Sequence, residues 1–272
     1  MKKQFICLLL VYAVISFFSC SNKNTEIKYI EEPSLSKVLV KRALVVGVAD
    51  YIPILSFRNE KNEIVGYDIE IFEQVCRRLQ IRPIFYPIVW AKKEELLNAG
   101  AIDCIVSGFS LTEERKKHYT LLTPYLQNAQ IMVTLAKNGY TKISDLQNKR
   151  ICVQADSLGK PTVENNAELG STVEIIEEPN FIDLCNALDT GFADGIVVDL
   201  ISSYDKLMEK DIYAIMDEPL SSEFYTFAFR KTDKTLAARI EAVLKEMDSD
   251  GTIPVLSKKW FGANLSVINV GF

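Results

Sequence analysis

A ten-residue pattern occurs twice in the chain and constrains its fold more than any other feature. Residues 97–106 and 188–197, which start 91 positions apart, both follow Leu-x-x-Gly-x-x-Asp-x-Ile-Val. A glycine at this position suits the left-handed residue that ends a helix before a turn. The repeat predicts two similar lobes, in each of which a helix leads through a glycine turn into a buried strand. A chance match between two common helix–glycine–strand segments is the alternative.

Apolar runs and helical stripes alternate along the rest of the chain. Ala43–Val48 is continuously apolar, as expected of a strand that is buried on both faces of a parallel sheet. Apolar residues at helical spacing predict helices over 68–80, 181–188 and 236–247. Shorter strands are predicted at 84–86, 102–106, 151–153, 173–176 and 195–198. This alternation predicts an α/β fold.

Composition excludes several classes of protein. The 272 residues fit one or two domains, and 48% hydrophobic with 25% charged residues is an ordinary globular balance. The net charge of −5 argues against a nucleic-acid partner. His118 is the only histidine and no CxxC motif occurs, so we expect no metal site and no cofactor. Cys76, Cys104, Cys152 and Cys185 are interpreted as small buried residues, with disulfide pairing left open.

The first 20 residues resemble an export signal. Two lysines follow the initial Met, and residues 5–18 form an apolar run of 14 residues. A membrane-spanning helix needs roughly 20 apolar residues, so this run is too short to span. Residues 17–20 (Phe-Phe-Ser-Cys) resemble a lipoprotein cleavage box, which predicts removal of residues 1–19 and acylation of Cys20. Phe17 replaces the usual Leu, Val or Ile, and ordinary cleavage nearby is the alternative.

The two copies of the repeat are followed by polar residues suited to opposite charges. Ligands of open parallel sheets bind beyond the carboxyl ends of the strands. After the first copy, Ser107–Arg115 contains two hydroxyls, a glycine and a helix start, for which Ser110 with Glu113 forms a capping box and Thr112 is the alternative cap. A helix start and an arginine both favour a carboxylate. Alternatively, Arg115 is an exposed, solvated arginine of the helix with no role in binding.

After the second copy, Asp199 ends a hydrophobic strand. An acid in this place requires a cation, either a ligand ammonium or, alternatively, the amides of the following segment, which it would cap. Tyr51 and Trp90 are placed to cover the aliphatic part of a ligand, or else belong to the core. One lobe that holds a carboxylate and another that holds an ammonium would together bind an amino acid.

From about Ala43 to Gly262 the chain resembles the family 3 extracellular solute-binding proteins, the amino-acid receptors of ABC importers. The resemblance rests on the segments 64–71, 107–115, 124–125, 191–199, 250–252 and 259–262. It implies a two-lobed periplasmic-binding-protein-like (type II) α/β fold, in which each lobe is a mainly parallel sheet flanked by helices. Two crossovers are then expected, near 126–128 and 222–224.

The resemblance also implies roles for individual residues. Arg115 and Ser110 match the positions that hold the ligand α-carboxylate, and Gly108 matches a backbone N–H donor. Asp199 matches the acid that receives the α-ammonium. Tyr51 and Trp90 match the aromatic pair around the ligand side chain, with Asp50 nearby. The remaining predicted contacts are Ser107, Phe109, Gln154, Asp156, Ser157 and Leu158.

The chain departs from the family pattern after the first strand of the second lobe. Asp156-Ser157-Leu158 stands where the family has Gly-Ser-Thr, so Leu158 lacks the hydroxyl that would contact the carboxylate. Asp156 adds a charge beside the cleft. Together with Asp50, this acid favours a polar or cationic ligand side chain. Asp68, Asp103 and Asp194 are interpreted as structural caps.

The predicted organisation is a signal peptide (1–19), a lipidated cysteine and tether (20–40), lobe 1 (41–127 and 223–272) and lobe 2 (128–222). We expect a monomeric, exported, lipid-anchored receptor that delivers an amino acid to a permease and catalyses no reaction. Two alternatives remain: a dehydratase-type enzyme on the same scaffold, with Asp50 or Asp156 as general acid, and a ligand-sensing module.

Overall fold

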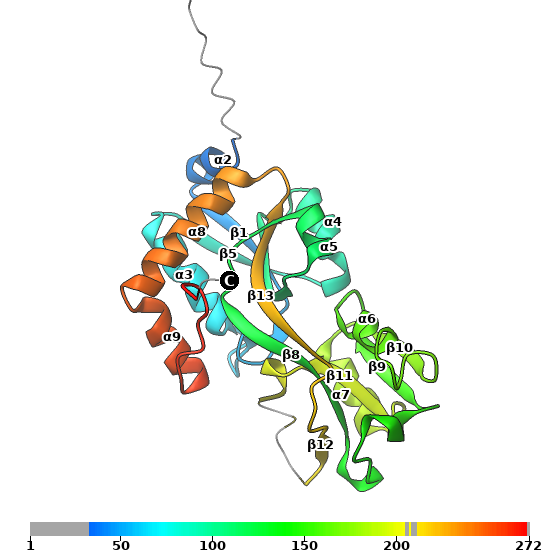
Figure 1. Ribbon diagram of the computed structural model, residues 1–272. Helices are drawn as coiled ribbons and strands as arrows, with labels where there is room; N and C mark the ends of the chain where they lie inside the picture. Colours follow the sequence, from blue (N-terminus) through cyan, green and yellow to red (C-terminus); the bar gives the residue numbers. More distant parts are fainter. Residues whose placement is uncertain (1–32, 205–206, 208–210, 271–272) are drawn as a thin grey trace, which may run out of the picture. The chain divides into compact units, whose positions relative to one another are not determined.

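The computed structural model describes residues 33–204, 207 and 211–270 (Figure 1). The predicted signal peptide, Cys20 and the first part of the predicted tether lie outside the described residues. Residues 34–40, predicted as the end of the tether, are instead part of helix α2 (Ser34–Lys41). This helix packs on lobe 1, because its apolar Val38 belongs to the core. Ser34 Oγ also accepts a hydrogen bond of 3.1 Å from Leu236 N. Among the described residues, no helix has the length and apolar character needed to cross a membrane.

Lobe 1 is built on four strands in the order β5-β1-β6-β13. They are β1 (Ala43–Val48), β5 (Arg82–Pro87), β6 (Cys104–Ser110) and β13 (Ser221–Arg230). The first three are parallel, and β13 is antiparallel to β6. The helices of this lobe are α3 (Tyr67–Arg78), α4 (Lys93–Asn98), α5 (Glu113–His118), α8 (Lys234–Ser249) and α9 (Thr252–Phe261). One hydrophobic cluster fills the lobe and includes residues of α8 and α9, so the chain returns to lobe 1 at its end.

Lobe 2 has the equivalent order, β10-β9-β11-β8. Its strands are β8 (Leu126–Leu135), β9 (Arg150–Gln154), β10 (Glu174–Glu178) and β11 (Gly195–Asp199), and its helices are α6 (Gly159–Glu164) and α7 (Phe181–Asp189). Again three strands are parallel and the fourth, β8, is antiparallel to β11. Two hydrophobic clusters fill this lobe on the two faces of the sheet.

Strands β8 and β13 connect the lobes. They pair antiparallel with each other, Asn128 opposite Glu223, and so join both sheets into one. Figure 1 shows the two strands side by side as they pass from one lobe to the other. Both predicted crossover segments lie in this pair. The predicted α/β architecture is therefore confirmed.

The remaining elements are short. A separate small sheet contains β2 (Tyr51–Ile52), β3 (Ser56–Arg58) and β4 (Ile64–Val65), while β7 (Tyr119–Leu121) pairs with β13 and β12 (Tyr213–Ile215) with β8. Four 3-10 turns complete the described structure: η1 (Trp90–Lys92), η2 (Ala136–Asn138), η3 (Ile143–Leu146) and η4 (Ile201–Tyr204).

The repeated sequence pattern forms the same structure twice. Gly100 and Gly191 adopt left-handed conformations, with φ of 75° and 72°. Asp103 Oδ2 accepts a hydrogen bond of 2.9 Å from Val45 N, and Asp194 Oδ2 accepts one of 3.0 Å from Arg150 N. Each aspartate thus joins the end of its turn to the neighbouring parallel strand rather than capping a helix. The equivalence of these contacts, together with the shared strand order, supports a real repeat over a chance match.

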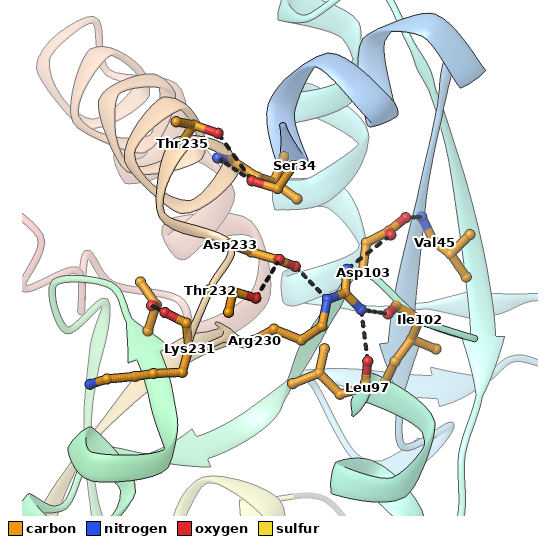
Figure 2. Close-up of polar contacts among 12 residues, drawn as sticks. Ser34, Val45, Leu97, Ile102, Asp103, Arg230, Lys231, Thr232, Asp233 and Thr235 are labelled. Carbon is orange, nitrogen blue, oxygen red and sulfur yellow. Dashed lines mark hydrogen bonds and ion pairs between the residues drawn. The ribbon is translucent and has the colours of Figure 1, made fainter. Parts of the chain in front are cut away.

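An arginine completes this turn in lobe 1 (Figure 2). Arg230 Nη1 donates to the carbonyl oxygens of Leu97 and Ile102, both at 2.7 Å, and Arg230 also pairs with Asp103 and Asp233. The Leu97 carbonyl oxygen also accepts the Gly100 N–H of the turn, at 3.1 Å. Arg230 therefore attaches the last residue of the long strand β13 to the repeated helix–turn unit.

Strand β6 is longer than the sequence predicts. It continues through Ser110, because Phe109 and Ser110 pair with Thr226 and Tyr225 of β13. Within it, Ser107 and Gly108 have φ of 75° and 76°, so the strand is kinked. Cys76, Cys104, Cys152 and Cys185 are buried, as interpreted from the sequence, and the first three are unpaired thiols.

Candidate functional site

A cavity lies between lobe 1 and lobe 2, with an empty volume of about 540 Å³ that includes the solvent at its mouth. Nine predicted site residues line it: Trp90, Ser107, Gly108, Ser110, Arg115, Gln154, Ser157, Leu158 and Asp199. Both lobes contribute. The cavity therefore brings together the two groups of residues that follow the repeated pattern.

Arg115 is the cation of the cavity. Its Nη1 donates to the carbonyl oxygen of Ser110 at 2.9 Å, and its guanidinium carbon lies 4.2 Å from the centre of the Phe109 ring. Thr112, not Ser110, caps helix α5, since its Oγ1 accepts a hydrogen bond from Arg115 N. Burial lowers the pKa of Arg115, and Glu223 partly opposes this. Within the part of the chain that the structure describes, no carboxylate forms an ion pair with Arg115.

Asp199 is the acid of the cavity. Its Oδ1 accepts hydrogen bonds from Asn128 Nδ2, at 2.9 Å, and from Gln130 Nε2. The pKa of Asp199 is raised to about 8, mainly by burial and in addition by the neighbouring Glu223. Among the described residues, no Lys or Arg pairs with Asp199, and no amide of the following turn donates to its carboxylate. The position therefore lacks a cation, and the capping alternative is not what the structure shows.

Asp68 fixes the kinked segment of β6 that carries the predicted hydroxyls of Ser107 and Ser110. Asp68 Oδ2 accepts hydrogen bonds from Ser107 N at 2.8 Å and from Tyr125 Oη at 2.9 Å. Burial raises the pKa of Asp68 to about 7. Ser107 Oγ accepts a hydrogen bond of 2.6 Å from Ser56 Oγ. Asp68 is thus structural, as expected, but it fixes the kinked loop rather than a helix end.

The two acids that favour a cationic ligand side chain are already paired. Asp50 Oδ2 lies 2.6 Å from Arg58 Nε, and the Asp156 carboxylate accepts a hydrogen bond from Lys93 Nζ. Neither acid lines the cavity. Both carboxylates form ion pairs with cations of this chain. The spacing of these residues in the sequence does not predict the two ion pairs.

Lys93 crosses from α4 to lobe 2. Its side chain is 3% exposed, and its Nζ also donates to the Asp156 carbonyl oxygen at 3.0 Å. Burial lowers the pKa of Lys93, and Asp156 opposes this shift. A second contact between the lobes joins Tyr51 Oη to Gln154 Nε2, at 2.9 Å. The lobes are therefore held together by contacts of their own.

The other predicted residues divide into cavity wall and support. Trp90 is buried in the wall, and its ring centre lies 6.1 Å from that of Phe109. Phe109 is fully buried beneath Arg115 and does not line the cavity. Tyr51 also lies outside the lining. Ser157 Oγ donates to the Gln154 carbonyl oxygen at 2.7 Å, while Leu158 presents an apolar wall, as expected.

Several residues of the site are not predicted from the sequence. Ile52, Gln130, Phe181, Leu184, Val197, Val198 and Ser202 also line the cavity. Asn128 donates directly to Asp199, and Glu223 is linked to Asp199 because both accept hydrogen bonds from the Asn128 amide. A signal existed for two of them: Asn128 and Gln130 are polar and two apart in an apolar strand, so they point to the same face.

Nothing in the described residues resembles a metal centre. No group of three or more His, Cys, Asp or Glu side chains gathers in the described part of the chain. His118 is exposed on α5 and pairs with Glu114.

Comparison with known proteins assigns the family. The sequence model of the bacterial extracellular solute-binding proteins, family 3, matches residues 44–263. The chain belongs to this family. Its members bind solutes outside the cytoplasm, which agrees with a cavity between two lobes and confirms the resemblance found in the sequence.

Named relatives and solved structures of this family are similar over most of the chain. The L-cystine-binding protein TcyJ of Escherichia coli is 27% identical, covering 88% of this chain and 90% of that protein. The glutamine-binding protein GlnH of an ABC transporter in Bacillus subtilis is 28% identical, covering 96% and 97%. The crystal structure of Tv2483 bound to L-arginine is 59% identical, covers 89% of this chain and 100% of that one, and has a TM-score of 0.87.

A histidine-bound substrate-binding protein of an ABC uptake transporter from Streptococcus pneumoniae has a TM-score of 0.81. It is 27% identical, covering 86% of this chain and 98% of that one. These neighbours confirm the two-lobed fold class.

Proposed function

We propose that this solute-binding protein is the receptor of an ABC importer and binds one α-amino acid between its lobes. Arg115 receives the α-carboxylate and Asp199 receives the α-ammonium. Ser110 and the Gly108 N–H assist the carboxylate. The relatives named above, which bind cystine, glutamine, arginine or histidine, support an amino acid as the ligand class.

One observation carries this proposal. Arg115 and Asp199 line the same cavity from different lobes, and neither has an ion-pair partner among the described residues. A buried charge without a partner is costly. A zwitterion supplies both missing partners at once, whereas a neutral solute supplies neither. Ligand that contacts both lobes favours their closed arrangement, because only that arrangement offers both anchors.

We propose L-arginine as the first candidate ligand. The support is the arginine-bound structure that shares 59% of its sequence with this chain. Asp50 and Asp156 are engaged elsewhere, so they do not offer an unpaired acid for the guanidinium. Trp90 offers an aromatic face, which attracts a cation. Gln154 Nε2 is engaged with Tyr51, which leaves Gln154 Oε1 as an acceptor.

A thermal-shift panel tests the ligand class. We expect arginine to raise the melting temperature most among arginine, ornithine, citrulline, glutamine, histidine and cystine, because a ligand that binds only the folded state stabilises it. A larger shift with another amino acid would reassign the side chain and keep the receptor. No shift with any of the twenty amino acids would refute the proposed function.

The cellular placement is also a proposal. The relatives function outside the cytoplasm with ABC transporters, which supports export and a permease partner. We propose that Cys20 carries a lipid, that residues 1–19 are removed, and that the chain acts as a monomer. We also propose lobe boundaries near residues 127 and 223, which the separate hydrophobic clusters support. Palmitate labelling of cells that express the full chain tests the anchor, since Cys20→Ala then abolishes incorporation.

We propose a receptor rather than an enzyme, and one neighbour makes the alternative testable. An ancestral amino-acid-binding protein, a precursor of cyclohexadienyl dehydratase, is 25% identical with a TM-score of 0.76 and covers 84% of this chain. The two acids considered as general acids, Asp50 and Asp156, are both in ion pairs. Prephenate incubated with the purified protein should remain unchanged, whereas conversion to product would identify a dehydratase.

A further inference from the structure

Two carboxylates, not one, occupy the ammonium end of the cavity. Glu223 lies on β13 directly opposite Asn128 of β8 and is 7% exposed. Its Oε1 accepts hydrogen bonds from Asn128 Nδ2, at 2.5 Å, and from Gln130 Nε2, at 2.9 Å. The same two amide groups donate to Asp199 Oδ1. Each amide thus uses one hydrogen on Asp199 and the other on Glu223.

This arrangement uses every available amide hydrogen and still leaves Glu223 undersatisfied. An amide NH₂ has two hydrogens, so Asn128 and Gln130 have none left to donate. Glu223 Oε2 is buried, and among the described residues it has no hydrogen-bond donor. Two carboxylates that share a site cannot both ionise without a large penalty. The cluster therefore requires either a proton or an external cation.

The surrounding charges do not remove this requirement. Arg115 of α5 attracts both acids but forms an ion pair with neither. Tyr225 of β13 lies near Asp199, and burial together with both acids raises the pKa of Tyr225 well above its ordinary value, so it stays neutral. Lys93 and Asp156, which lie outside the cavity lining, neutralise each other. Tyr119, with a raised pKa, is neutral and faces Arg115.

We propose that Glu223 is the second acid of the ammonium site and that it shares one proton with Asp199 until a ligand ammonium displaces that proton into solution. This inference rests on the proposed role of Asp199. Glu223 then acts as a positioning residue, because it sets the protonation of the acid that meets the ligand. Glu223 lies on the connecting strand β13. The charge of the site therefore changes, on ligand binding, at the place where the two lobes are joined.

The sign of the pH dependence follows from the direction of the shift. The pKa of Asp199 is raised to about 8, so the empty site holds its proton at neutral pH and loses it when the ammonium enters. Binding at pH 7, where the ligand ammonium is fully protonated, should therefore release protons, whereas a carboxylate that is already ionised would release none. The dissociation constant should rise about tenfold between pH 7 and pH 6, because ligand and proton compete.

Isothermal titration calorimetry measures this release directly. Arginine is titrated into the full mature protein at pH 7 in several buffers that differ in ionisation enthalpy. The slope of the observed binding enthalpy against the buffer ionisation enthalpy gives the number of protons released per ligand bound. Glu223→Gln, which keeps the shape and acceptor of the side chain, should release fewer protons than the wild type at pH 7 and show a weaker dependence of affinity on pH between 6 and 7. Glu246→Gln on α8 changes the net charge equally and should behave like the wild type.

The outcomes separate this inference from the proposed function. Wild-type binding without proton release at pH 7, or equal release by Glu223→Gln, would overturn the shared proton and leave the receptor intact. Failure of the wild type to bind any amino acid would overturn both. Should Glu223→Gln fail to fold, the wild-type proton count at pH 7 decides by itself, since the ligand ammonium is fully protonated at that pH and an unshared, ionised carboxylate releases no proton.

Discussion

The two lobes share a scaffold but place opposite charges at equivalent positions. Strands β6 and β11 both follow the repeated helix–turn unit and both end at the cavity. In lobe 1 the chain continues through a kinked loop to the cation Arg115, whereas in lobe 2 the strand ends on the acid Asp199. The comparison shows that the repeat fixes where functional groups stand, while the residues after it determine the sign of the charge.

The lobes also complete the same turn in different ways. In lobe 1 the guanidinium comes from Arg230 on the distant strand β13, with 22% of its side chain exposed. In lobe 2 it comes from Arg150 on the adjacent strand β9, with 39% exposed, and it contacts Asp194 and the Gly191 carbonyl oxygen. The helix end and its aspartate require a cation in both lobes, but only in lobe 1 does that cation attach a connecting strand.

Removing either charged anchor should cause the largest effect. Arg115→Ala and Asp199→Asn should each weaken amino-acid binding at least about 100-fold, because each leaves the opposite end of the zwitterion unpaired in a desolvated site. Calorimetry and thermal shift measure this loss. Lys116→Ala, an exposed neighbour in helix α5, is the control and should bind normally. An unchanged response of Arg115→Ala would place the carboxylate elsewhere.

The two turn arginines should differ in their effect on stability. Arg230→Met should lower the free energy of unfolding by about 3 kcal/mol, because Asp103 and the carbonyl oxygens of Leu97 and Ile102 each lose a charged hydrogen-bond donor. Arg150→Met should lower it by about 1 kcal/mol, since its site is more exposed. Urea unfolding of the two variants measures the gap. Equal losses would mean that attachment of β13 contributes nothing extra.

The contact between Lys93 and Asp156 should have a smaller effect, and on ligand affinity rather than on folding. Asp156→Asn leaves the Lys93 ammonium buried without its carboxylate only when the lobes are together, so affinity should fall about fivefold. Lys93→Met in the same chain should restore most of it. Lys92→Met, which alters an exposed lysine, should change neither property. Full affinity of Asp156→Asn would exclude a role in closure.

The two turn glycines should be equivalent. Gly100→Ala and Gly191→Ala should each cost about 1 kcal/mol, because both have positive φ and a Cβ at either would meet no atom within 4 Å. The penalty is then conformational alone. Thermal unfolding of both variants measures it, and a difference above about 1 kcal/mol would show that the two turns are not the same.

Much of the fold could be predicted because the signals are local. Strand β1 matches its predicted bounds of 43–48, and helix α7 begins at the predicted Phe181, since continuous apolar runs and helical stripes depend only on neighbours in the chain. Helix α2 was missed because its stripe is short and a polar segment precedes it. The extension of β6 depends on pairing with β13, more than 100 residues away.

The site was predictable in part for the same reason. Arg115, Ser110 and Asp199 follow repeated local patterns at strand ends, and all three line the cavity. Pairings across the chain left no local trace. Lys93 is 63 residues from Asp156, and Asn128 is 95 residues from Glu223. Side chains that are partners only in space cannot be matched from spacing.

The sequence by itself determined that the chain forms two α/β lobes, and it located the residues that end the repeated strands, because hydrophobic periodicity and glycine turns are encoded by adjacent residues. Only the tertiary structure decided which charges are free for a ligand. It engaged Asp50 and Asp156 with cations of the chain and left Arg115 and Asp199 facing one cavity. The physical reason is that the cost of a buried charge depends on what lies within a few ångströms in space, and folding alone sets those distances.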